Sequence, residues 1–111
     1  MVPANHRSEK AYRRHAEEVA ALLRAVLESP AVTDPATRAA AYQSDEELSP
    51  PLRQYVAKVL GESYRITDDD VQRLLTAGYS QDAVFEITVA TALGAAMQRL
   101  ETGLRVLREV R

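Results

Sequence analysis

The sequence predicts an all-α protein with five or six helices. Apolar side chains recur at spacings of three and four residues through most of the chain, whereas no segment alternates apolar and polar residues as a half-buried strand would. The chain has 111 residues, 46% of them hydrophobic, with only four glycines and five prolines. This length and composition favour a single helical domain, 1–111, and exclude disorder as a description of the whole chain.

The first predicted helix is amphipathic, covers residues 8–28 and lies in an N-terminal region, 1–32. Its apolar face consists of Tyr12, Ala16, Val19, Leu22, Leu23, Val26 and Leu27. Pro30 and Pro35 interrupt the pattern, because each proline disfavours α conformation in the residue before it. The rest of the chain, 33–111, is predicted to form the helical core and to open with a short helix from about Pro35 to Gln43.

The third predicted helix covers about residues 51–63. Ser49 matches an N-cap, and Pro50 follows it at the first helical position, where proline costs no hydrogen bond. The buried stripe of this helix is predicted to be Leu52, Tyr55, Val56, Val59 and Leu60.

The fourth predicted helix starts after Thr67, whose hydroxyl can accept a hydrogen bond from the amide of Asp70. Asp68, Asp69 and Asp70 fill its first turn, where the helix dipole favours negative charge. Successive helical residues point about 100° apart, so the three carboxylates cannot converge on one cation. Gly78 is the predicted C-terminal cap of this helix.

The last predicted helix starts at Ser80 and is apolar nearly all the way round from Ala83 to Met97. We therefore expect its first half to be central and buried, and its second half to be amphipathic along Leu100, Leu104 and Leu107. Ala90 and Gly94 are small residues that allow another helix to approach closely.

The composition limits the function. The formal net charge is −2, and no lysine or arginine lies between Leu74 and Gln98, so the helix–turn–helix pattern around Gly78 lacks the basic side chains that contact DNA. We predict no nucleic-acid partner, no membrane association and a cytoplasmic location. There is no cysteine, which excludes thiol catalysis and thiolate metal sites.

Glu86 is the strongest candidate for a functional residue, because it stands alone among apolar neighbours in the last helix. Its carboxylate must reach solvent, pair with a base or stay protonated, so an ion pair, an interface contact and an acid–base role are all open. Tyr64 and Arg99 are weaker candidates. A small polar pocket would combine Tyr64, Arg65, Tyr79, Gln98 and Arg99.

We predict no cofactor and no metal site. His6 and His15 are the only imidazoles, and their spacing does not place them on one helical face. The pair of His15 and Glu18 would need further ligands from other helices to hold a metal.

Residues 66–104 resemble the C-terminal half of the carboxymuconolactone decarboxylase and AhpD-like alkylhydroperoxidase superfamily. The similarity lies in "TAGYSQDAVFEI", a helix end followed by an apolar-Glu-apolar pattern, and in the small-residue helix "VATALGAAMQRL". The resemblance implies an all-helical subunit that assembles into a dimer, trimer or hexamer through its apolar last helix.

In active peroxidases of this superfamily, a Cys-x-x-Cys pair and a histidine precede the helix end. By this resemblance their positions fall near Ser63, Ile66 and Asp70, which cannot carry out disulfide exchange. The function expected is therefore that of a non-redox, oligomeric binding or accessory protein with a possible small-molecule ligand. The alternatives are an enzyme acting on a small organic acid through Glu86, and a helical regulator or interaction module.

Overall fold

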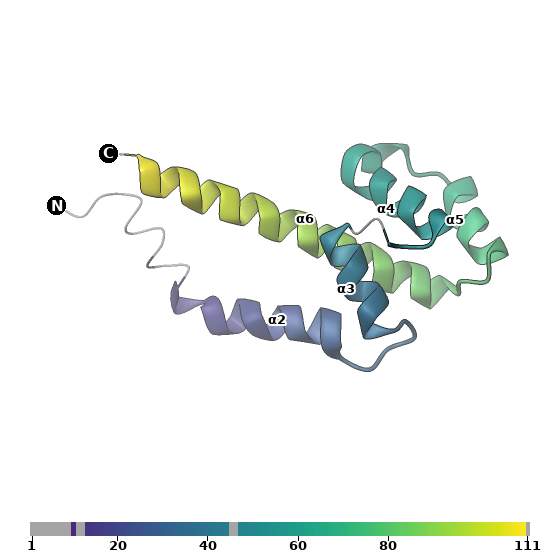
Figure 1. The fold of residues 1–111 in the computed structure, drawn as a ribbon, viewed down its shortest axis with the longest axis horizontal. Coiled ribbons are helices and arrows are strands. Elements are labelled where there is room, and N and C mark those ends of the chain that lie inside the picture. The colour runs from purple at the N-terminus through teal and green to yellow at the C-terminus, as the bar shows by residue number, and fades with distance from the viewer. Residues whose placement is uncertain (1–9, 11–12, 45–46, 111) are drawn as a thin grey trace.

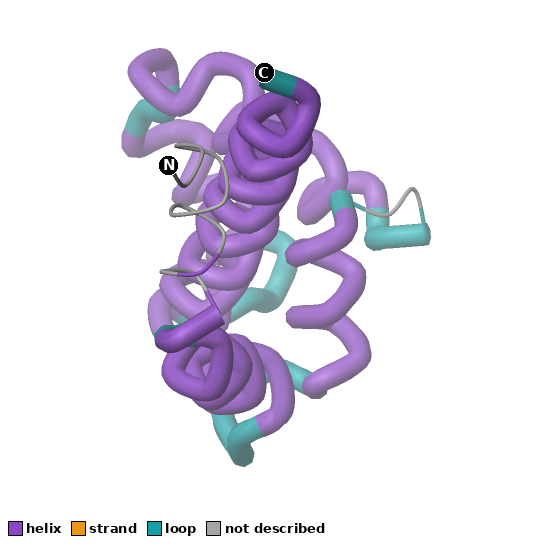
Figure 2. Tube along the Cα trace, turned by 90° about the vertical axis from the view of Figure 1, so that its left-hand side faces the viewer, coloured by secondary structure: helices purple, strands orange, loops and turns teal. Residues whose placement is uncertain are grey.

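The computed structural model describes residues 10, 13–44 and 47–110. Within these residues the secondary structure is helical and contains no strand, which confirms the all-α fold class (Figures 1 and 2). The elements in chain order are α2 (Ala16–Glu28), α3 (Pro35–Gln43), α4 (Pro50–Glu62), the short 3-10 helix η1 (Ser63–Arg65), α5 (Asp68–Thr76) and α6 (Gln81–Glu109).

Helix α6 organises the fold. Its 29 residues give a rod about 44 Å long, and it crosses the molecule from the α5 side to the C-terminus (Figure 1). Helix α3 makes the most extensive packing with α6, followed by α4, whereas α2 and α5 contact it over smaller areas. Helix α6 is therefore the shared support for the other helices.

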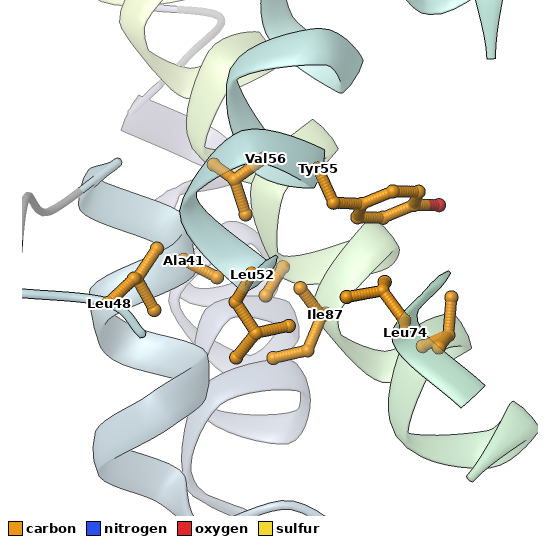
Figure 3. Close-up of a cluster of buried hydrophobic side chains, with 9 residues drawn as sticks. Ala41, Leu48, Leu52, Tyr55, Val56, Leu74 and Ile87 are labelled. Carbon is orange, nitrogen blue, oxygen red and sulfur yellow. The ribbon is translucent and has the colours of Figure 1, made fainter. Parts of the chain in front are cut away.

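The hydrophobic core lies where α3, α4 and α5 meet α6 (Figure 3). It consists of Ala41, Leu48, Leu52, Tyr55, Val56, Leu74, Val84, Ile87 and Ala90. The stripe expected on α4 is confirmed, since three of its members are buried there and Val59 and Leu60 pack against the cluster.

The predicted boundaries of α5 and α6 are confirmed at their caps. The Thr67 hydroxyl accepts a hydrogen bond from the amide of Asp70, and the Asp70 carboxylate accepts one from the amide of Thr67, which forms a capping box. Gly78 adopts a φ of +106°, and the amides of Gly78 and Tyr79 donate to the last turn of α5. Ser80 caps α6 through a bond from the amide of Ala83.

The first helix differs from its prediction. Residues 8, 9, 11 and 12 lie outside the described residues, and His15 is a turn residue that separates residues 13–14 from α2. Helix α2 contains no buried residue, although it carries the predicted apolar face from Ala16 onward. Val26 and Leu27 pack against the core, while Leu22 is 52% exposed, because only the end of α2 near α3 reaches the other helices.

The expectation that the first half of α6 is wholly buried is wrong for one of its faces. Ile87, Ala90, Thr91 and Gly94 are buried on the side covered by α3 and α4, but Phe85 is 69% exposed on the other side. The physical reason is geometric, since the short helices α3, α4 and α5 cover only part of the circumference of α6.

Candidate functional site

The structure places the Glu86 carboxylate against the loop between α2 and α3. One oxygen accepts hydrogen bonds from the amide of Thr33 at 2.8 Å and from its hydroxyl at 2.6 Å. The other oxygen accepts a hydrogen bond from the amide of Val32 at 3.0 Å. Glu86 therefore ties a loop more than fifty residues earlier in the chain to the first turns of α6.

These bonds favour the charged form of Glu86. The hydroxyl bond from Thr33 is the largest cause that lowers the pKa of Glu86 below its ordinary value, and it outweighs burial, which acts in the opposite direction. The amides of Thr33 and Val32 and the charge of Arg38 lower the pKa further. An ionised carboxylate with three donors fits the structural interpretation of Glu86 better than that of a proton donor.

Arg38 completes this anchor and was not singled out in the sequence. It is only 2% exposed, and its guanidinium donates to the carbonyls of Val26 and Ser29 at 2.6 Å each. These carbonyls lie at the C-terminal end of α2, where positive charge is favourable. The available signal was one arginine within the alanine-rich segment "ATRAAA", on the side of α3 that also contains buried Ala41.

The other two predicted site residues do not join Glu86. Tyr64 lies in η1 and is 83% exposed. Arg99 is exposed on α6, thirteen residues beyond Glu86, which corresponds to about 20 Å along the helix axis.

The wider polar pocket is also not assembled. Tyr79 precedes α6 and its hydroxyl bonds Ser49 Oγ at 2.7 Å, whereas Gln98 lies in the second half of that helix. Arg65 is exposed and pairs with Glu62 at 2.9 Å. The residues that the sequence grouped in one pocket thus belong to separate regions of the surface.

The structure instead contains a cleft between α4 and α5, with a volume of about 380 Å³. It is lined by Pro50, Pro51, Gln54, Tyr55, Lys58, Asp70, Arg73 and Leu74. Tyr55 and Leu74 belong to the hydrophobic core, so the lining is partly apolar, while Lys58, Asp70 and Arg73 contribute charged side chains from both helices. We call this cavity the α4–α5 cleft.

Asp70 is the centre of charge in the α4–α5 cleft. Lys58 Nζ lies 2.7 Å from one of its oxygens, and Arg73 lies 3.5 Å from the other. The bond from Lys58 is the largest cause that lowers the pKa of Asp70 from 3.8 to about 2, and the amide of Thr67 is the second. The predicted hydrogen bond from the amide of Asp70 to Thr67 is confirmed, whereas the burial of the Asp70 side chain and its link to α4 through Lys58 were missed.

Neither a metal centre nor a membrane span is found in the described part of the chain. Its residues contain no group of three or more His, Asp or Glu side chains that could hold a metal ion. His15 Nδ1 lies 3.1 Å from Glu18, and both side chains are exposed, whereas His6 falls outside the described residues. None of the described helices is long and apolar enough to cross a membrane.

No protein-family model, curated protein or solved structure matches this chain.

Proposed function

We propose that the protein is a non-redox, AhpD-like oligomeric protein of the carboxymuconolactone decarboxylase type, which binds a small organic anion in the α4–α5 cleft as a cytoplasmic binding or accessory protein. Peroxidase chemistry through thiols is excluded, because the chain has no cysteine. The all-helical fold supports this proposal, as do the turn at Gly78 between α5 and α6 and the small-residue helix that follows.

The observation that carries the proposal is the composition of the α4–α5 cleft. Lys58 and Arg73 both lie beside Asp70, so two cations face one carboxylate. Arg73 is largely exposed and makes only a long contact of 3.5 Å, which leaves donors of its planar guanidinium for a second anion. The apolar part of the lining, which includes Pro50, Pro51 and Tyr55, suits the carbon skeleton of such a ligand.

The cleft also includes Asp70, one of the positions at which the resemblance places the redox residues of active peroxidases. By that correspondence, Asp70 stands near the histidine position, while Ser63 and Ile66 replace the cysteines. Ser63 is the first residue of η1, and Ile66 packs against the core. We infer that a reactive centre has been replaced here by a capping and charge network, with binding retained.

The proposal is tested by calorimetric titration with benzoate and with benzamide, its uncharged counterpart of the same size. We expect benzoate to bind and benzamide not to bind, because the cleft offers cations. Arg73→Gln should weaken benzoate binding about tenfold, as expected for loss of a charge-assisted hydrogen bond.

Arg65→Gln is the matched control, since Arg65 is exposed, pairs with Glu62 and does not line the cleft. Its benzoate affinity should equal that of the natural chain. Equal binding of benzoate and benzamide, or an unchanged affinity in Arg73→Gln, would exclude the cleft as an anion site. A native mass spectrum of the natural chain gives the subunit number and any retained ligand.

A further inference from the structure

The outer face of α6 is exposed and lacks charge over most of its length. We define it as the face formed by Phe85, Val89, Ala92, Ala96 and Leu100, which follow one another at spacings of three and four residues. Four of these five residues are exposed, and Val89 is half-buried. A helix face in permanent contact with water normally carries charged side chains, so this face has the composition of a contact surface.

The described helices of the same chain pack on other sides of α6. Glu86 faces the loop between α2 and α3, Gly94 faces α3 through Tyr42, and Thr88 faces α4 through a hydrogen bond of 2.7 Å to Tyr55. These contacts place the covering elements on both flanks and on the inner side. In the described part of the chain, the outer face therefore stays largely exposed.

The two ends of the outer face carry opposite charges. Asp82 lies in the first turn of α6, and Arg99 lies seventeen residues later, about 25 Å along the axis. Both are exposed, and neither forms an ion pair with another residue in the described part of the chain. Between them the outer face has no charged residue.

This charge arrangement is self-complementary for two antiparallel copies of α6. If Asp82 lies opposite Arg99 of a second copy, the midpoint of the pairing falls between residues 90 and 91. The same midpoint places Phe85 opposite Ala96 of the second copy and Val89 opposite Ala92. Phe85 and Val89 then each meet an alanine, and antiparallel helix dipoles add to the attraction.

We propose that the outer face of α6 is a dimer interface, in which it binds the same face of a second copy in antiparallel orientation. A twofold axis crosses this interface at the level of residues 90 and 91 along α6 and generates two equivalent Asp82–Arg99 pairs at the ends. The charge pairs set the orientation and the register, and the apolar face between them supplies most of the buried surface. This inference rests on the proposed function, which includes an oligomeric state, and it identifies the outer face of α6 as the surface through which the oligomer forms.

Charge reversal tests the pairing through sedimentation equilibrium at several protein concentrations. Asp82→Arg and Arg99→Asp should each raise the dimer dissociation constant at least about tenfold, because each creates like-charge pairs at both ends. The double variant Asp82→Arg/Arg99→Asp should recover dimerisation. A mixture of the two single variants should form a heterodimer, since every pair across that interface is again opposite in charge.

Glu101→Arg is the control, because Glu101 is exposed on a different side of α6. It should leave the dissociation constant unchanged, and circular dichroism should show the same helix content in every variant. Weakening in both single variants without recovery in the double variant would overturn the antiparallel register.

The results also separate this inference from the proposed function. A natural chain that is oligomeric and insensitive to both single reversals would overturn the interface while leaving the oligomeric state intact. A natural chain that stays monomeric up to about 1 mM would overturn both the interface and the oligomeric part of the proposed function. Benzoate binding to such a monomer would still support the α4–α5 cleft.

Discussion

The inner and outer faces of α6 are both mainly apolar, but the inner face is buried and the outer face is exposed. On the inner face, Ile87, Ala90 and Thr91 are completely buried under α3, α4 and α5. On the outer face, Phe85 and Ala92 are exposed. The difference teaches that apolar composition around a helix predicts contact on all sides, while the number and length of neighbouring helices decide which side one chain can cover.

Truncation of a large side chain on each face should give the largest contrast. Ile87→Ala is expected to lower the free energy of unfolding by about 2–5 kcal/mol, because it leaves a cavity in the core. Phe85→Ala should change it by about 0.5 kcal/mol or less at protein concentrations where the chain is monomeric. Urea unfolding measures both values, and equal losses in the two variants would contradict the distinction between the faces.

The two glycines of α6 provide a second contrast. A Cβ at Gly94 would overlap the carbonyl oxygen of Tyr42, whereas a Cβ at Gly103 would meet no atom within 4 Å. Gly94→Ala should therefore cost about 1–3 kcal/mol through overpacking against the backbone of α3. Gly103→Ala should stabilise the chain by about 0.5–1 kcal/mol through its better helix propensity. Thermal unfolding that moved in the same direction for both variants would show that α3 does not fix the inner face.

Low pH should weaken the packing of α5 against α4 through protonation of Asp70. Because the pKa of Asp70 is lowered to about 2 in the folded chain, its contribution to stability is complete well above pH 3.8 and is lost as the pH falls through about 2. Asp70→Asn keeps an acceptor for the cap but lacks the charge that Lys58 contacts.

The stability difference between the natural chain and Asp70→Asn should shrink as the pH falls, as followed by urea unfolding between about pH 6 and pH 2. Asp69→Asn is the control in the same helical turn, because Asp69 is exposed and has no contact with Lys58 in the structure. A difference that stayed constant with pH would mean that the Lys58–Asp70 pair does not hold α5 to α4.

Glu86 lies between the inner and outer faces of α6, and its substitution should have the smallest and most local effect on the structure. Glu86→Gln removes the charge that binds the amides of Val32 and Thr33. Hydrogen exchange at these two amides should become faster, while exchange in the core of α6 changes little. Glu101→Gln should leave both amides unaffected. Unchanged exchange in Glu86→Gln would exclude the anchoring role of Glu86 and favour the alternative that it acts as an acid or base.

Local signals in the sequence determined the ends of most helices. Thr67 and Ser80 cap α5 and α6 with their own hydroxyls, and Gly78 adopts the positive φ that ends the turn between them. These signals act over three or four residues, so they can be read without knowledge of the fold. Ser49 shows the limit of this rule, since it precedes α4 as predicted but its hydroxyl contacts Tyr79 and does not cap the helix.

The candidate site was less accessible to prediction, because its contacts join distant parts of the chain. The sequence identified Glu86 as unusual and placed Asp70 at a helix cap, but it could not supply the distant partners of either residue. Thr33 is 53 positions from Glu86, and Lys58 comes from a separate helix. Arg38 was missed altogether, since an arginine in a short helix usually lies on the surface.

The sequence by itself determined an all-helical, cysteine-free chain whose helices begin and end at local caps. Only the tertiary structure decided that Glu86 anchors a loop, that Lys58 and Arg73 meet at Asp70, and that one face of α6 stays uncovered. The physical reason is range. Capping and periodicity depend on neighbours along the chain, whereas ion pairs, clefts and interfaces depend on which surfaces the packed helices leave facing one another.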